Sequence, residues 1–245
     1  MAKTRRFRVE SLDGMRVGDA LPLPPDEVRH ARVLRLNGGD EIELFDDAGR
    51  VAVAFLASAG ELVARISAVR AAEVRGAPLT LAVAWPKGKR AALLVEKCVE
   101  LGADCIIPVR FERSVVTKDE DSDGLARLRR IAMEAAKQCG RNHLPEITVE
   151  RTLAEVLNEV QGGALVFVLD PHAQKWLPEA LVAEDGRIGR VPMLFVVGPE
   201  GGFSPAEERS FDSLVRVRVA ENVLRVETAA MAACAIARAF LSTSK

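Results

Sequence analysis

The stretch that decides the fold is MLFVVGPEGGFSPAEE, residues 193–208. Its first five residues, 193–197, are all apolar, which is typical of a strand in a parallel sheet that helices cover on both faces. Gly198, Gly201 and Gly202 follow this run. Because glycine has no side chain, these residues let a ligand approach the main chain closely. The stretch therefore predicts a buried strand that ends in a glycine loop.

The residues after the glycines have the pattern of a helix start. Ser204 is a favoured capping residue, Pro205 suits the first helical position, and Glu207 completes a capping box. A loop between a strand and a helix is a common place for a ligand in α/β proteins. The loop lacks the glycine patterns that hold phosphates or dinucleotides, and a tight turn without a ligand remains open as an alternative.

Strands and helices alternate through the rest of the second half of the chain, which is typical of an α/β fold. The strands are expected at 79–85, 105–109, 164–169 and 193–197, and the helices at 89–101, 124–139, 152–160, 205–213 and 227–241. Earlier, from His30 to Arg70, short alternating strands separated by glycine turns indicate a small β-barrel. The periodicity stops in AAEVRGAP, residues 71–78, so the expected domains are 1–74 and 75–245.

Composition excludes several classes of protein. A chain of 245 residues with 49% hydrophobic content is long enough to bury two cores. The four cysteines include no C-x-x-C pair and are expected to be reduced thiols in the core. The three histidines lack the spacing of metal ligands, so no bound metal is expected. The sequence has no apolar leader and no run of about 18 apolar residues. We therefore expect a cytoplasmic protein that does not enter a membrane.

Positive charge is concentrated in two zones, although the whole chain has a net charge of −1. Residues 1–38 and residues 85–143 each carry a net charge of +3, which favours a localised surface for a polyanion. Within the helix expected at 124–139, Lys137 and Arg141 belong to a basic face that is available to phosphates. Ordinary solvated charge remains open as the alternative.

Two motifs make a specific resemblance. GPEGGFSPAE, residues 198–207, and NVLRVETA, residues 222–229, resemble the two C-terminal signatures of the RsmE family, which are uridine-N3 methyltransferases of small-subunit ribosomal RNA in the SPOUT class. EKCVELGADCIIPV, ERSVV, AKQCGRNHLPEI, and RRF with HARVLRLNGGDEIELFD also match in the family's order. The resemblance covers essentially the whole chain.

The resemblance implies an N-terminal PUA-like β-barrel that helps to grip RNA. It also implies a C-terminal SPOUT-type α/β domain with a trefoil knot that binds S-adenosylmethionine. The implied partner is small-subunit (16S) ribosomal RNA or the assembled 30S subunit. SPOUT relatives build each active site near a subunit interface, and the small-residue helix at 229–237 offers a close-packing face, so we expect a homodimer. A role for this helix in the core alone stays open.

The resemblance also implies that the glycine loop and the second signature enclose the cofactor. The implied cofactor-binding residues are Leu169, Gly198, Pro199, Glu200, Gly201, Gly202, Val219, Val223, Leu224, Arg225, Thr228 and Ala229. The chain departs from the family where Ala220 and Asn222 replace the usual glycine and arginine. Asn222 can form hydrogen bonds but cannot neutralise a negative charge, so we expect cofactor binding to persist and RNA positioning by this loop to weaken.

Methyl transfer to the N3 atom of uracil needs orientation and one proton acceptor. Because the chain has no tyrosine, Glu200 and Glu227 are the candidate acceptors by residue type, and a structural role for either stays open. Arg225 is expected to stabilise the negative charge that develops on the base. The expected RNA contacts are Arg5, Arg6, His30, Arg32, Arg35, Lys97, Arg113 and Arg141.

Two other classes of function remain open at this stage. A non-enzymatic RNA-binding protein with a degenerate methyltransferase domain would account for the basic zones and for the altered loop at 219–222. A small-molecule α/β enzyme that uses a nucleotide would account for the glycine loop alone.

Overall fold

The contacts within the chain divide it into two units. The structure, a computed structural model, describes residues 5–58, 62–73, 76–114, 122–160 and 163–243. The first unit consists of residues 1–75 and 136–144, and the second of residues 76–135 and 145–245. The sequence analysis assigned 136–144 to the second domain, whereas the contacts place this segment with the first. The boundary expected at residues 74 and 75 lies outside the described residues.

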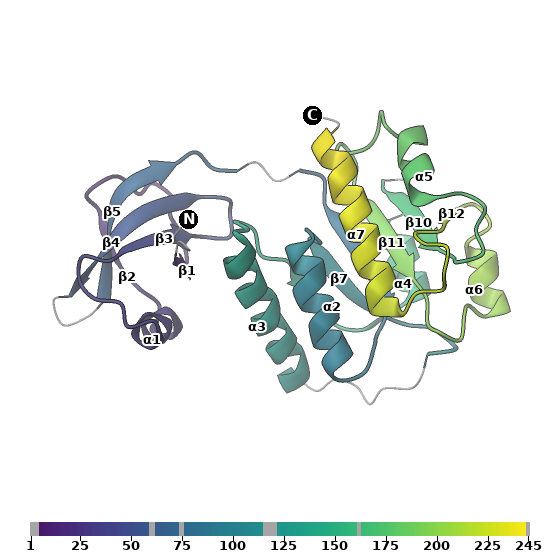
Figure 1. Ribbon diagram of the computed structural model, residues 1–245, viewed down its shortest axis with the longest axis horizontal. Coiled ribbons are helices and arrows are strands. Elements are labelled where there is room, and N and C mark those ends of the chain that lie inside the picture. Colours follow the sequence, from purple (N-terminus) through teal and green to yellow (C-terminus); the bar gives the residue numbers. More distant parts are fainter. Residues whose placement is uncertain (1–4, 59–61, 74–75, 115–121, 161–162, 244–245) are drawn as a thin grey trace. The chain divides into compact units, whose positions relative to one another are not determined.

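The first unit is built on one five-stranded sheet with the strand order β1-β3-β4-β5-β2 (Figure 1). The strands are β1 (Arg6–Arg8), β2 (Ala20–Pro22), β3 (Glu41–Phe45), β4 (Val51–Ser58) and β5 (Leu62–Arg70). β1 pairs with β3 in parallel, and the other neighbours are antiparallel. Phe7, Ile42, Leu44 and Ile66 are buried in the core of this unit.

Helix α1 (Pro25–Val33) also belongs to the first unit, and it includes His30, where the sequence analysis expected strands to begin. Proline stands at the start of the helix, and Asp26 and Glu27 are in its first turn. Both features stabilise a helix start, since proline fixes the backbone angle and carboxylates favour the positive end of the helix dipole. This local signal overrides the alternation that suggested a strand.

The second unit is a seven-stranded sheet whose described pairings are all parallel. The strand order is β12-β10-β11-β6-β7-β8, and β9 pairs with β7. The strands are β6 (Leu79–Ala84), β7 (Cys105–Arg110), β8 (Glu146–Ile147), β9 (Arg151–Thr152), β10 (Leu165–Leu169), β11 (Met193–Val197) and β12 (Val215–Val217). The α/β fold is thus confirmed, and every residue of β11 is buried, as its sequence predicted.

Among the residues that the structure describes, six helices follow β6 along the chain. They are α2 (Lys89–Glu100), α3 (Ser122–Cys139), α4 (Leu153–Glu159), α5 (Leu177–Ala183), α6 (Pro205–Ser210) and α7 (Val226–Thr243). Figure 1 shows α2 and α7 side by side over the sheet, and α7 contacts both β6 and β11. None of the described helices is long and apolar enough to cross a membrane.

The small residues of α7 are used inside the chain. Ala230, Ala233 and Ala237 are fully buried, and α7 contacts α2 and α5 as well as the sheet of its own unit, which agrees with the core-helix alternative. A homodimer stays a prediction.

At the end of α3, the burial of two side chains differs from what the sequence predicted. Lys137, expected on an exposed basic face, is 8% exposed and forms an ion pair of 2.5 Å with Glu27. Cys139, expected in the core, is exposed.

Candidate active site

A cavity of about 410 Å³ lies at the carboxyl ends of three neighbouring strands of the second unit. Leu169 ends β10, Val197 ends β11 and Val217 ends β12, and all three line the cavity. Such a volume suits a small organic ligand, and the carboxyl edge of a parallel sheet is where such ligands usually bind.

Most of the residues expected to bind a cofactor meet in this cavity. Those that line it are Leu169, Gly198, Pro199, Glu200, Gly202, Val219, Val223, Leu224 and Ala229. Gly201, Arg225 and Thr228 were also expected but are not among its lining residues. Asp170, His172 and Arg218 line the cavity and were missed, because no motif in the sequence marks them.

The glycine loop has two positions at which glycine is required. A Cβ atom at Gly198 would lie 2.5 Å from the ring of Phe203, so a side chain here would displace the aromatic ring. Gly202 has a φ of +71°, a conformation that other residues adopt only with strain. At Gly201, which the sequence made equally prominent, a Cβ atom would lie 3.3 Å from the carbonyl oxygen of Arg113.

The start of α6 holds the far end of this loop in place. The Ser204 hydroxyl accepts a hydrogen bond of 3.2 Å from the Glu207 amide, and the Glu207 carboxylate accepts one of 2.7 Å from the Ser204 amide. The capping box expected from the sequence is therefore confirmed. Glu207 is 8% exposed, and its second oxygen accepts a hydrogen bond of 2.8 Å from the amide of Glu112, which follows β7.

The acidic residues of the cavity already have positive partners. Arg216 lies 2.6 Å from Glu208 and 3.5 Å from Asp170, and Arg90 lies 3.3 Å from Glu200. Burial alone would lower the pKa of Arg216, but its hydrogen bonds to Glu208 and Asp170 outweigh that effect and raise the pKa above its ordinary value. Arg216 therefore remains charged, and the two carboxylates share it.

The candidate catalytic residues lie at different depths. Glu200 lines the cavity, and its side chain is 56% exposed. Glu227, in the first turn of α7, is 4% exposed, and one of its carboxylate oxygens is buried without a hydrogen-bond partner among the described residues. Arg225 is exposed just before α7, and its carbonyl oxygen accepts a hydrogen bond of 2.9 Å from the Ala229 amide. Glu200 is therefore the more accessible of the two candidate carboxylates.

One of the expected RNA contacts is wrong. Arg6 is 8% exposed, and all three of its guanidinium nitrogens donate hydrogen bonds, to Glu43, to the Arg141 carbonyl oxygen and to Asn142. A guanidinium that is buried and fully engaged in this way does not reach an RNA phosphate. Arg6 is a structural residue of the first unit.

Several other expected RNA contacts already interact with side chains or backbone groups of the protein. Arg5 lies 3.7 Å from Asp40, and the ring of His30 lies 5.4 Å from that of Phe7. Hydrogen bonds to Glu100 and Glu96 raise the pKa of Lys97 to about 12, so its charge is permanent but locally compensated. Arg113 donates a hydrogen bond of 3.4 Å to the Gly201 carbonyl oxygen in the glycine loop, and Arg141 is half-buried.

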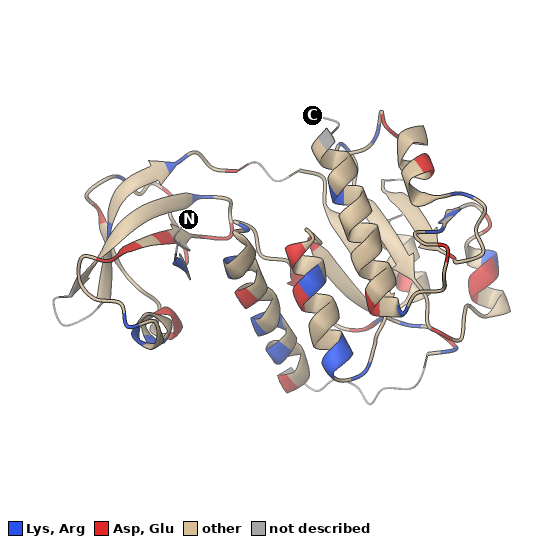
Figure 2. Ribbon diagram, in the orientation of Figure 1, with Lys and Arg blue, Asp and Glu red and all other residues tan. Residues whose placement is uncertain are grey.

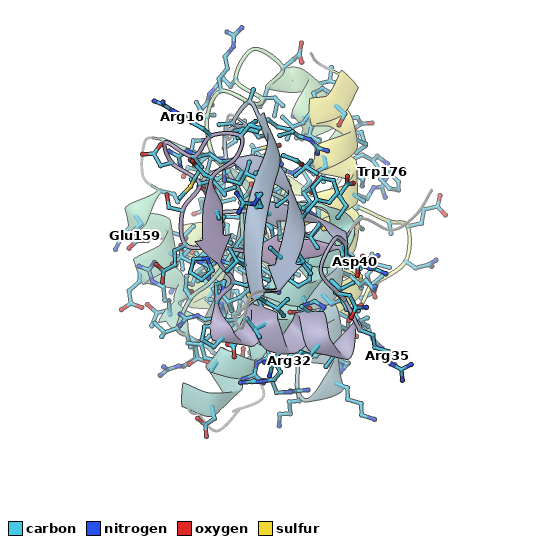
Figure 3. The ribbon with its side chains drawn as sticks, turned by 90° about the vertical axis from the view of Figure 1, so that its left-hand side faces the viewer. Arg16, Arg32, Arg35, Asp40, Glu159 and Trp176 are labelled. Atoms are coloured by element: carbon cyan, nitrogen blue, oxygen red, sulfur yellow. The ribbon has the colours of Figure 1, made fainter. Side chains whose placement is uncertain are left out.

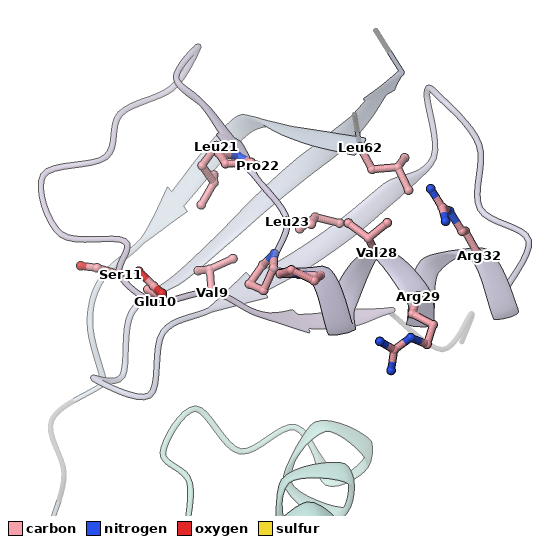
Figure 4. Close-up of a pocket in the computed structure, with 12 residues that line it drawn as sticks. Val9, Glu10, Ser11, Leu21, Pro22, Leu23, Val28, Arg29, Arg32 and Leu62 are labelled. Carbon is pink, nitrogen blue, oxygen red and sulfur yellow. The ribbon is translucent and has the colours of Figure 1, made fainter. Parts of the chain in front are cut away.

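Arg32 and Arg35 are the exposed cations that best fit a phosphate-binding role. Both extend away from the ribbon near α1 (Figure 3). A second cavity, of about 890 Å³, lies beside them in the first unit. Figure 4 shows that apolar side chains such as Leu23 and Val28 line it, together with Arg29 and Arg32. In contrast, α3 carries basic and acidic side chains interspersed (Figure 2).

No group of three or more His, Cys, Asp or Glu side chains in the described ranges is arranged to hold a metal ion.

Comparisons with known proteins place the chain in a family. A family model described as an RNA methyltransferase domain matches residues 74–238, and one described as an RNA methyltransferase PUA domain matches residues 23–67. The ribosomal RNA small subunit methyltransferase E of Mycobacterium bovis is 32% identical over 219 residues, which are 85% of this chain and 82% of that protein. The chain belongs to the ribosomal RNA small subunit methyltransferase E family. The resemblance found in the sequence is thus confirmed.

Other members of this methyltransferase E family agree with the fold. The Bacillus subtilis member is 30% identical over 83% of this chain and 84% of its own length. The crystal structure of the Neisseria gonorrhoeae member, bound to S-adenosylmethionine, superposes with a TM-score of 0.82 at 30% identity and covers 95% of each chain. The first unit of the present chain is accordingly a PUA-like domain.

Proposed function

We propose that this chain transfers a methyl group from S-adenosylmethionine to the N3 atom of a uridine in small-subunit ribosomal RNA. The main support for the proposal is the cavity at the ends of β10, β11 and β12, which nine of the twelve expected cofactor-binding residues line. The chain that forms this cavity belongs to the methyltransferase E family. The structure of the relative bound to S-adenosylmethionine supports the same cofactor for this chain.

The residues of the cavity fit this cofactor on physical grounds. Gly198 and Gly202 add no side chains of their own to the loop, so their backbone groups are available to a ligand. The volume of about 410 Å³ falls within the range for small-molecule sites. When bound, the cofactor supplies an electrophilic methyl group on a sulfonium. The protein has to hold the uracil in line with that group and exclude water, and orientation alone is worth about 7–11 kcal/mol of the barrier.

Removal of the N3 proton falls to Glu200 in this proposal. Its carboxylate lines the cavity and is accessible, whereas that of Glu227 is buried in the first turn of α7, where it interacts favourably with the helix dipole. Arg225 stands between two lining residues, Leu224 and Val226, and is exposed to an incoming base. We assign it the stabilisation of the negative charge that develops on the uracil ring.

The remaining parts of the proposal concern the surroundings of the reaction. The PUA-like first unit binds the RNA through exposed cations such as Arg32 and Arg35, and the substrate is the ribosomal RNA alone or within the 30S subunit. A trefoil knot in the second unit and a homodimer, which the family resemblance implies, and a cytoplasmic location, expected from the composition, stay predictions.

The test is direct. The protein is incubated with labelled S-adenosylmethionine and small subunits that lack the modification, and the RNA is digested into nucleosides. We expect labelled 3-methyluridine, and a structured ribosomal substrate should react better than a short duplex because extruding a base from a duplex costs more. If cofactor binding is confirmed and 3-methyluridine is absent, the assignment is overturned even if another nucleoside is labelled.

A non-enzymatic RNA-binding protein is the second candidate, because Ala220 and Asn222, which depart from the family pattern, both line the cavity. Calorimetry separates the two candidates. A degenerate domain would not bind S-adenosylmethionine, whereas the enzyme would.

A further inference from the structure

One charged side chain that lines the cavity of the second unit has no partner of opposite charge. The lining residues with a formal charge are Asp170, Glu200, Glu208 and Arg218. Asp170 and Glu208 share Arg216, Glu200 pairs with Arg90, and neither arginine lines the cavity. Arg218, in contrast, has no ion pair and no side-chain hydrogen bond to any residue that the structure describes. Its guanidinium is therefore the charged group of the lining whose donors are available to a ligand.

The position of Arg218 is fixed before any ligand arrives. Its amide donates a hydrogen bond of 2.9 Å to the Lys175 carbonyl oxygen, and its own carbonyl oxygen accepts one of 3.0 Å from the Leu177 amide. Between these two residues, the ring of Trp176 lies under the guanidinium, whose central carbon is 4.3 Å from the ring centroid. This cation–π contact covers one face of the guanidinium and restrains its rotation.

The free edge of Arg218 is suited to a carboxylate. Its Nε atom is buried and has no hydrogen-bond acceptor in the described part of the chain, which is costly for a polar group in a native protein. A guanidinium presents Nε and one terminal nitrogen as a planar fork that a carboxylate accepts with both oxygens. A ligand carboxylate would therefore satisfy the unpaired donor and pair with the guanidinium at the same time.

We propose that Arg218, stacked on Trp176, binds the carboxylate of S-adenosylmethionine and makes this end of the cavity selective for the intact amino-acid part of the cofactor. The inference rests on the proposed function. The cofactor has one negatively charged group, its carboxylate, and its two positive groups suit a cavity that carries Asp170, Glu200 and Glu208. An RNA phosphate is the less suitable anion, because Arg218 lines the small cavity that the proposed function assigns to the cofactor.

The test uses two ligands that differ only in the carboxylate, S-adenosylmethionine and decarboxylated S-adenosylmethionine. Calorimetry with the full-length protein should show that the wild type binds the first about 10- to 100-fold more tightly, as expected for a hydrogen-bonded charge pair. R218Q should lose most of this preference while its affinity for the decarboxylated ligand stays within about 3-fold. R218K should retain an intermediate preference, since it keeps the charge but not the fork.

R209Q is the matched control, because Arg209 is an exposed arginine of α6 that does not line the cavity. It should keep the wild-type preference, which would show that the effect does not come from net charge. The inference is overturned if R218Q keeps the wild-type ratio, or if R218Q weakens both ligands equally. It is also overturned if R218Q lowers only the affinity for ribosomal RNA, because the anion would then be a phosphate.

The two proposals fail in different ways. If the wild type binds neither ligand, the proposed function itself is wrong. If the wild type binds both with equal affinity, the cofactor assignment stands and only the role of Arg218 is wrong.

Discussion

The buried carboxylate of Glu207 should be one of the main supports of the glycine loop. It accepts two backbone hydrogen bonds, of 2.7 Å from Ser204 and 2.8 Å from Glu112. A hydrogen bond to a charged group contributes about 1.5–3 kcal/mol. Glu207→Gln keeps one acceptor oxygen and turns an NH2 group toward the other amide, so we expect a loss of about 1.5–3 kcal/mol in the free energy of unfolding.

The assay can be confined to the unit that contains this contact. The two tryptophans of the chain, Trp85 and Trp176, both belong to the second unit, so urea unfolding followed by tryptophan fluorescence reports on that unit. Glu208→Gln is the matched control, since Glu208 pairs with Arg216 at the half-exposed surface and should lose at most about 1 kcal/mol. If Glu207→Gln is no less stable than Glu208→Gln, the carboxylate does not hold the loop.

We make three further predictions about substitutions in the two units. Gly198→Ala should weaken S-adenosylmethionine binding more than Gly201→Ala in calorimetry, because only the former places a Cβ atom 2.5 Å from an aromatic ring. Asp46→Asn should reduce the loss of stability in acid, measured by amide signals of the first unit in NMR spectra. Arg32→Ala should reduce the salt slope of RNA binding by about one unit, whereas Arg6→Ala should instead cost about 3 kcal/mol of unfolding free energy.

The environment of Asp46 determines how acid changes the stability of the first unit. Burial alone would raise the pKa of this carboxyl, but hydrogen bonds from the Leu12 and Ala48 amides and from Arg50 outweigh burial and lower the pKa below 3.8. A lowered pKa in the folded state stabilises the fold at pH values above the unfolded pKa. This contribution is lost as the pH falls through the folded pKa, so the wild type and Asp46→Asn should converge in stability below about pH 4. Parallel stability curves for the two proteins would contradict this reasoning.

The features that the sequence predicted correctly are local. The five apolar residues 193–197 predict a strand that is buried on both faces. Ser204 and Glu207 lie three residues apart, so the capping box is contained in one short stretch of sequence. Residues of the two sequence motifs also line the cavity of the second unit. In such cases the physical cause and its sequence signal occupy the same few positions.

The features that the sequence missed depend on distant partners. Arg6 was expected to be free because its hydrogen-bond acceptors lie 37 and 135 positions away along the chain. Arg218 carries no motif, and its role depends on Trp176, which belongs to a different segment. The position of β6 beside β11 is likewise a property of chain topology that no local pattern specifies.

Residues 136–144 belong to the first unit although they follow part of the second unit in the sequence, which limits where the chain can be cut into separate domains. A fragment that ends at residue 75 would keep the guanidinium of Arg6 and the carboxylate of Glu27 but would lose Asn142 and Lys137, which partner them. Removing one partner of a buried charge pair costs about 3–5 kcal/mol, a large part of the stability of a domain of this size. The PUA-like unit is therefore not a removable module. Swapping it between relatives would require the end of α3 to be exchanged with it.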